Sequence, residues 1–137
     1  MIEPVVRAVL DASAMLSYAR EHVHVGELLT EFGDEGSAAA VPAVTLLEAH
    51  ARVIDDELAT LRLDMLGKLP TTTLLELGRR EAQLASHVVP LVKGDLSKAH
   101  AVWAALRYRA YLITAEPAAL PSIIDPSTVV VIPQHDA

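Results

Sequence analysis

Four acidic residues stand at the ends of apolar runs or beside them: Asp11, Glu48, Asp95 and Glu116. The carboxyl ends of parallel strands meet at one edge of a sheet, so we expect acids in such places to converge there. Two carboxylates about 4 Å apart repel by roughly 4 kcal/mol at an effective dielectric near 20, so a cluster needs a cation or protons. Mg²⁺ and Mn²⁺ prefer oxygen ligands and can activate a water for in-line attack on a phosphodiester.

Each acid also has a plainer interpretation. Asp11 and Asp95 both fit helix N-caps. Glu48 fits a solvated helix position, although it flanks an apolar stripe, and Glu116 fits the start of a loop. The hydroxyls of Ser13 and Thr114 are suited either to backbone hydrogen bonds or to orienting the carboxylates. The sequence leaves both interpretations open at each position.

Short apolar runs predict the strands that must position these acids. We expect strands at residues 5–10, 38–41, 71–77, 111–114 and 129–132. Helical patterns lie between them, so the sequence predicts an α/β fold with a central parallel sheet covered by helices on both faces. No repeat or linker interrupts this pattern, and we expect a single domain over residues 1–137.

Two helices have clear sequence patterns. One uses Val25, Leu28, Leu29 and Phe32 at helical spacing, and Gly33 and Gly36 are expected to stop it. The clearest period in the chain is the apolar series Leu47, Ala51, Ile54, Leu58, Leu61 and Met65. This series predicts one face of an amphipathic helix or of a helical hairpin.

Composition narrows the classes of protein. There is no cysteine, which excludes a disulfide framework, a thiolate zinc site and a cysteine nucleophile. No signal peptide is evident in Met1–Pro4, and no apolar stretch approaches the length of a membrane span, so we expect a cytoplasmic protein. The net charge is −7, so binding to nucleic acid would need a local basic surface, bound cations or a partner protein.

The other charged and aromatic residues have modest roles in this interpretation. His22 is expected on the surface and His100 in packing, and Trp103 falls on an apolar stripe and is expected in the core. The candidates for phosphate contact are the arginines Arg79, Arg80, Arg107 and Arg109, with solvated charge as the default.

The order of four motifs resembles the PIN-domain family, especially the VapC-type toxins of bacterial toxin–antitoxin pairs. Val9–Leu16 resembles the first motif, with an aspartate after a strand and a hydroxyl two residues later. Val41–Ala49 resembles the second, a helix that presents a glutamate. Ala99–Leu106 resembles the alanine-rich helix, and Tyr111–Glu116 resembles the closing strand, which normally ends in Thr-X-Asp.

The resemblance implies a small α/β/α sandwich, usually a homodimer, that cleaves RNA with Mg²⁺ or Mn²⁺ and is restrained by a small antitoxin. Asp11 and Glu48 would bind the metal, and Asp95 and Glu116 would complete the cluster directly or through water. Ser13 and Thr114 would belong to the same cofactor site.

Two positions depart from the family pattern. Lys98 stands where an aspartate usually precedes the alanine-rich segment, and Asp95 lies roughly 4.5 Å earlier along the helix axis. Glu116 replaces the last aspartate and moves its carboxylate by roughly 1.5 Å, against a metal–ligand tolerance of about 0.2 Å. We hypothesise that the Lys98 ammonium partly replaces the metal ion.

These departures keep two alternatives open. The first is a degenerate PIN-like module that acts by binding protein or nucleic acid. The second is a phosphatase or another metal-dependent hydrolase, which the lack of a glycine-rich phosphate loop disfavours.

Overall fold

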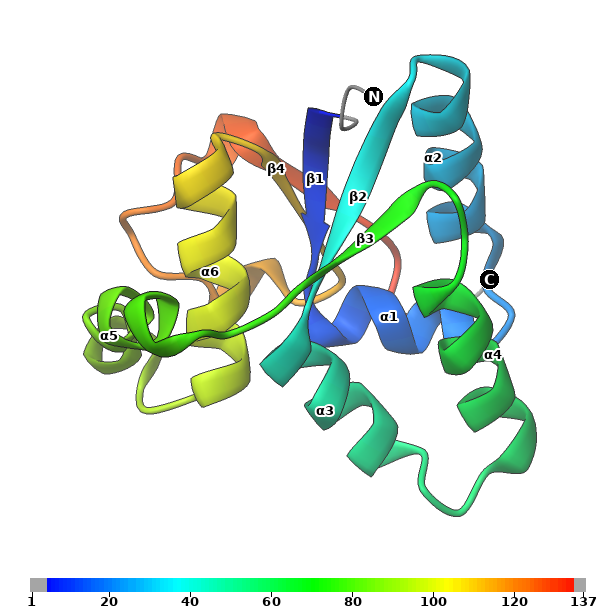
Figure 1. The fold of residues 1–137 in the computed structure, drawn as a ribbon, viewed down its shortest axis with the longest axis horizontal. Helices are drawn as coiled ribbons and strands as arrows, with labels where there is room; N and C mark the ends of the chain where they lie inside the picture. The colour runs from blue at the N-terminus through cyan, green and yellow to red at the C-terminus, as the bar shows by residue number, and fades with distance from the viewer. Residues whose placement is uncertain (1–4, 135–137) are drawn as a thin grey trace.

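The computed structural model describes residues 5–134 and builds them around one parallel sheet. The strands lie in the order β3-β2-β1-β4-β5, with β1 at the centre (Figure 1). Their bounds are Val5–Leu10 for β1, Ser37–Pro42 for β2, Thr72–Leu75 for β3, Tyr111–Thr114 for β4 and Val129–Val131 for β5. The chain builds outward from β1 in one direction and then resumes at β4 on its other side. The boundary between β1 and β4 is therefore the switch point at which open α/β sheets bind ligands.

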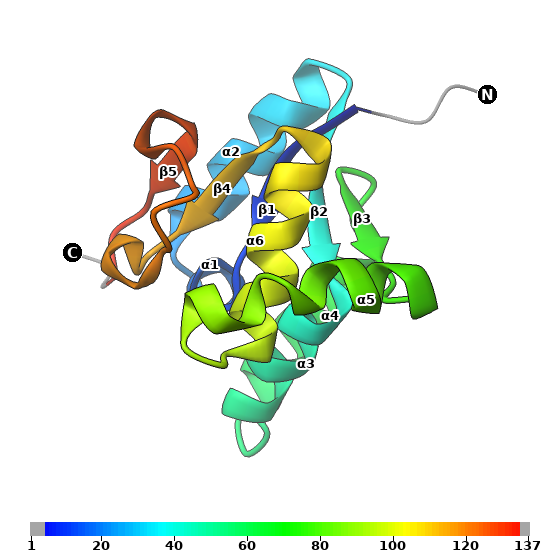
Figure 2. The ribbon, with the colours of Figure 1, turned by 90° about the vertical axis from the view of Figure 1, so that its left-hand side faces the viewer.

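Helices cover both faces of the sheet, so the fold is the predicted three-layer α/β/α sandwich (Figures 1 and 2). Their bounds are Ala12–Ala19 for α1, Val23–Asp34 for α2, Ala43–Arg52 for α3, Glu57–Gly67 for α4, Arg79–Ser86 for α5 and Leu96–Tyr108 for α6. The helices α1, α2 and α4 lie on one face, and α5 and α6 lie on the other. Three 3₁₀ turns complete the described elements, at Val89–Val92, Pro117–Ala119 and Pro126–Thr128.

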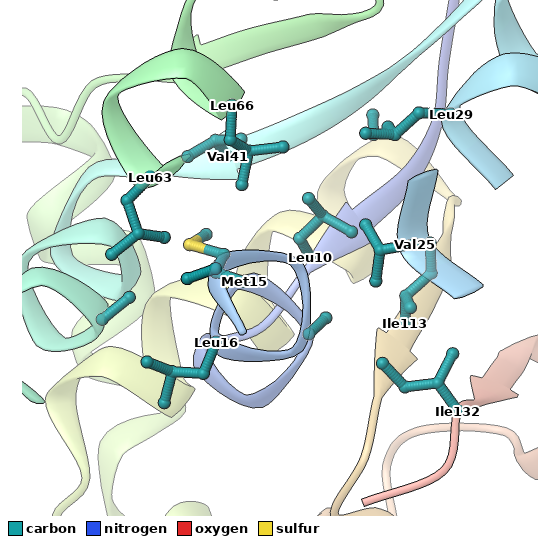
Figure 3. Close-up of a cluster of buried hydrophobic side chains, with 14 of the residues drawn as sticks. Leu10, Met15, Leu16, Val25, Leu29, Val41, Leu63, Leu66, Ile113 and Ile132 are labelled. Carbon is teal, nitrogen blue, oxygen red and sulfur yellow. The ribbon is translucent and has the colours of Figure 1, made fainter. Parts of the chain in front are cut away.

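Successive residues of the central strands alternate between two cores. Leu10 and Ile113 belong to the cluster under α1, α2 and α4, whereas Val9 and Leu112 belong to the cluster under α6. This period of two is the geometry of a strand buried on both faces. Figure 3 shows the first cluster, in which Met15 of α1 meets side chains of the sheet and of α4. Small side chains let α6 pack closely against the sheet, because its buried face is mostly alanine.

The predicted apolar series between residues 47 and 65 forms a helical hairpin. The side chain of Asp56 caps α4 by accepting a hydrogen bond from the Ala59 backbone N–H at 3.0 Å, so the chain turns between α3 and α4. The large members of the series are exposed and do not face the core, with 51–76% of each accessible: Leu47, Ile54, Leu58, Leu61 and Met65. We call these five side chains the hairpin surface. The core side of the hairpin is made by other residues, such as Ala49 and Leu63.

Element ends differ slightly from the predicted ones. Gly33 lies inside α2, and the turn after that helix is made by Gly36, which has a φ of +74°. Strand β3 is shorter than predicted and ends at Leu75. Trp103 is only partly buried and packs against the edge of the second core.

Two predictions concern the ends of the chain and its relation to membranes. Met1–Pro4, in which no signal peptide was evident, lie outside the described residues. Within residues 5–134, every helix is too short or too polar to cross a bilayer.

Candidate functional site

Parallel pairing of β1 with β4 brings Asp11 beside Thr114. Leu10 is in register with Ile113, and the Asp11 backbone N–H donates to the Ile113 carbonyl at 3.2 Å. Both strands end at this point, so the residues that follow them meet at the switch point of the sheet. The predicted convergence of the two strand ends is therefore observed.

A hydrogen-bond network fixes the carboxylate of Asp11. Its Oδ1 accepts from the Ser13 hydroxyl at 2.6 Å and from the Ala14 backbone N–H at 2.9 Å. The Ser13 Oγ lies 3.3 Å from the Thr114 Oγ1 and accepts from the Ala115 backbone N–H at 2.8 Å. Asp11 is thus a helix N-cap and is also held in one orientation by a neighbouring strand end. Ser13 takes part in both interactions that the sequence left open, because it binds the carboxylate and the backbone.

The other oxygen of Asp11 is buried without a partner. Only 2% of Asp11 is exposed, and its Oδ2 has no hydrogen bond within the described part of the chain. Burial raises the pKa of Asp11, while hydrogen bonds from Ser13, Thr114 and Ala14 and the charge of Lys98 act in the opposite direction. A capping role needs only one carboxylate oxygen, so the orientation and burial of Oδ2 exceed what capping requires.

Lys98 lies close enough to Asp11 for its charge to act on that carboxylate. Its side chain is only 11% exposed, and its Nζ is 3.8 Å from Glu116 Oε1. The Glu116 carboxylate therefore faces an ammonium from the same chain. Lys98 acts on both acids, because its charge also lowers the pKa of Asp11 against the larger effect of burial.

The two remaining acids also have partners of their own. Asp95 caps α6, since its Oδ1 accepts from the Lys98 backbone N–H at 3.0 Å. Glu48 pairs with Arg52, with 3.4 Å between its Oε2 and the arginine Nε. Arg52 was missed by the sequence analysis, although its position four residues after Glu48 is the usual spacing for an ion pair on a helix.

The four acidic side chains, as they are arranged here, do not fit a resident divalent ion. Within residues 5–134, no three acidic or histidine side chains are grouped so that they could hold a metal. Asp11 Oδ2 is the one well-oriented buried oxygen among the four acids that lacks a partner in that range. Glu48 and Glu116 already face cations. The metal-binding role of the four acids stays a prediction.

His100 is a buried residue of α6 and was expected to serve packing. It stacks on Trp103, and its Nδ1 accepts from the Val44 backbone N–H at 3.2 Å. Burial lowers the pKa of His100, so its neutral form is favoured in the folded protein.

This shift predicts how stability depends on pH. Because the pKa of His100 is lower in the folded than in the unfolded protein, the unfolded chain binds more protons in the interval between the two values. The contribution of neutral His100 to the free energy of unfolding is therefore complete above its ordinary pKa near 6.5. It is lost as the pH falls toward the lower pKa of the folded protein. We expect His100→Gln to flatten the fall of the urea midpoint between pH 7.5 and 5. Exposed His87 provides the control: His87→Gln should retain the parental slope, and an equally steep His100→Gln profile would contradict the prediction.

Comparison with known proteins supports the fold. No family model matches the sequence, and no curated protein matches it either. Among solved structures, the chain is similar to one of VapBC2 from Rickettsia felis bound to a DNA fragment from its promoter. The TM-score is 0.66 and the identity 11%, over 93% of this chain and 98% of that one. It is also similar to a toxin–antitoxin complex from Klebsiella pneumoniae, with a TM-score of 0.56 and 17% identity over 95% of this chain and 99% of that one. The chain therefore shares the fold of these two structures, and that fold is compatible with the VapC-type PIN fold that its motifs resemble.

Proposed function

We propose that this chain is a VapC-like protein of the toxin–antitoxin type that binds RNA at the sheet edge around Asp11. The observation that carries the proposal is the buried, oriented carboxylate of Asp11 at the sheet's switch point, close to the Lys98 ammonium that pairs with Glu116. An anionic substrate would be repelled by Asp11 and Glu116 alone. Lys98 compensates this charge from within the chain, where the resemblance implies Mg²⁺ or Mn²⁺.

Local basic residues support binding of RNA to a protein with a net charge of −7. Arg20 and Arg52 line a hollow together with Ser13 and Glu116, and Lys98 pairs with Glu116. These cations stand at the sheet edge, where phosphate contacts would position a bound strand.

A partner protein is supported by the hairpin surface. Its five large apolar side chains are more than half exposed, and they lie on two consecutive helices and on the turn between them. Apolar side chains gathered on one surface mark interaction sites. We infer that a small antitoxin-type protein covers this surface; a homodimer contact is the alternative, and a cytoplasmic location stays a prediction.

A second candidate function is favoured by the partnerless Oδ2 of Asp11. In a divalent-metal-dependent ribonuclease this oxygen would bind Mg²⁺ or Mn²⁺, with Glu48, Asp95 and Glu116 completing the cluster directly or through water. When bound, such an ion would supply the Lewis-acid chemistry of phosphodiester hydrolysis. This function requires the acids to exchange Lys98 and Arg52 for the ion.

Binding and cleavage assays separate the two functions. We expect the parent to bind a structured RNA without divalent ions, with an affinity that falls as salt rises. Lys98→Gln should weaken binding by about tenfold, a change of roughly 1.4 kcal/mol, because Asp11 and Glu116 then lose their cation. Lys68→Gln is the control, since Lys68 is an exposed lysine at the end of α4.

The outcomes point to different conclusions. Cleavage by the parent with Mn²⁺ that is absent from Asp11→Asn would establish the ribonuclease and overturn the metal-free site. Equal cleavage by both proteins would indicate a contaminant. Neither binding nor cleavage of RNA would contradict both functions.

A further inference from the structure

A small polar hollow opens beside the acidic site, between the end of α1 and the end of α3. It has a volume of about 110 Å³, room for roughly three to four waters at about 30 Å³ each. The lining side chains that matter are polar or charged: Ser13, Ser17, Arg20, His22, Arg52 and Glu116. Helices α1 and α3 pack against each other and so bring Arg20 and Arg52 to one place.

Two polar atoms of this lining have no partner among residues 5–134. The Ser17 Oγ is buried, in a residue that is only 4% exposed, and the His22 Nδ1 is buried as well. A buried hydroxyl without a hydrogen bond is unfavourable, because it has lost its contacts with water and gained none in return. Such a pair of atoms in the wall of a polar hollow indicates that the hollow receives a ligand with oxygen or nitrogen atoms.

The charge of the lining selects an anion. Arg20 and Arg52 contribute two guanidinium groups, and the one carboxylate of the lining, Glu116, is paired with Lys98. Glu21 lies between Arg20 and His22 but is turned away, because it pairs with Arg62 at 2.7 Å. Guanidinium groups bind phosphate with strong charge-assisted hydrogen bonds.

The carbonyl groups at the end of helix α1 would repel an anion if they were unpaired, but they all have hydrogen-bond partners. The carbonyls of Leu16, Ser17 and Tyr18 accept from the backbone N–H groups of Arg20, His22 and Glu21. The remaining carbonyl, that of Ala19, accepts from Arg62 Nη1 at 3.1 Å. Glu21 adopts a φ of +64° in this turn, which brings the chain back so that the His22 N–H reaches the Ser17 carbonyl.

We propose that this hollow binds a phosphate group of the RNA backbone, held by Arg20 and Arg52 with hydrogen bonds from Ser17 and His22. The inference rests on the proposed function, and it names the contact that anchors a strand beside Asp11. Arg52 would turn from Glu48 toward the phosphate, which its exposed position allows. Arg20 is exposed and has no ion pair within the described residues.

Inorganic phosphate tests the site directly. Titration followed by NMR is expected to shift the amide signals of Ser17, Arg20 and His22 in a saturable way. Arg20→Gln should weaken phosphate binding by about tenfold, and Ser17→Ala by about threefold. Ser17→Ala removes a hydroxyl without a partner, so this variant should fold at least as stably as the parent. Arg7→Gln, an exposed arginine on β1, removes the same charge elsewhere and should bind phosphate like the parent.

A second arm uses the structured RNA and distinguishes the failure of this inference from that of the proposed function. Competition of RNA with phosphate, lost in Arg20→Gln, would support both. RNA binding unchanged in Arg20→Gln and Ser17→Ala would overturn the phosphate site and leave the proposed function standing. Phosphate binding in the hollow without any RNA binding would retain the anion site but overturn its assignment to RNA. Signals that shift equally for the parent and Arg20→Gln would show nonspecific phosphate binding and overturn the inference.

Discussion

Lys98→Asp is expected to raise the affinity of the protein for Mn²⁺ by at least tenfold. In the parent, the Lys98 ammonium lies 3.8 Å from Glu116 and acts on Asp11, so a divalent ion must enter a pocket that already holds a cation. At that distance a unit charge interacts by roughly 4 kcal/mol at an effective dielectric near 20. In the variant, a third carboxylate near Asp11 and Glu116 takes the place of the ammonium that repels the metal. Carboxylates are the kind of ligand that Mn²⁺ and Mg²⁺ prefer.

Two measurements check this expectation. Calorimetric titration gives the affinity, and thermal unfolding gives an independent signature. Without metal, the three acids should repel and lower the Tm of the variant below that of the parent. With Mn²⁺ in excess over the dissociation constant, the Tm should rise, because an ion that binds only the folded state stabilises it.

Arg80→Asp supplies the matched control. Arg80 is exposed on α5, so the variant has the same net charge but no new carboxylate near Asp11, Asp95 and Glu116. It should bind Mn²⁺ as weakly as the parent. Tight binding by the parent itself would show that Lys98 leaves the pocket readily, and the internal-cation interpretation would then be wrong.

The sequence predicted the sheet well because its strands carry two independent signals. The run from Val5 to Leu10 is short, nearly all apolar and followed by a helix cap. The strand β1 occupies this range in the structure. Alternation of strands with helices then leaves few parallel topologies, so the meeting of Asp11 with Thr114 could be anticipated. The identity of the unusual residue, Lys98, was also readable from its place before an alanine-rich helix.

The partners of the acids were not predictable from the same patterns. Glu48 is expected at the site by its place on α3, but its pairing with Arg52 depends on rotamers and on what faces the helix. The series from Leu47 to Met65 has ideal helical spacing, yet its large side chains are exposed. Periodicity shows that residues share a face, but it does not show whether the sheet or a second protein covers that face. The hollow at Ser17 arises from the packing of α1 against α3, which has no local signal.

Asp11→Asn is expected to stabilise the folded protein at neutral pH by about 0.5–2 kcal/mol, the usual size of a stabilising substitution. Burial, the largest influence, raises the pKa of Asp11 in the folded state. The folded protein therefore binds more protons than the unfolded chain between the ordinary and the raised pKa, and the stability falls as the pH rises through that interval. Asparagine stays neutral and is an equally good N-cap, so it can keep the bonds to Ser13 and Ala14.

Urea denaturation of the parent and Asp11→Asn at several pH values between 4 and 8 measures this effect. The advantage of the variant should be largest at neutral pH and should shrink as the pH falls and Asp11 of the parent becomes protonated. Asp125→Asn is the control: this exposed cap has a pKa lowered by its hydrogen bonds from Ser127, so the same substitution should bring no gain. A variant that is less stable than the parent at pH 7 would mean that attraction to Lys98 outweighs burial. The carboxylate would then be half of a stabilising internal ion pair, and its retention would need no functional explanation.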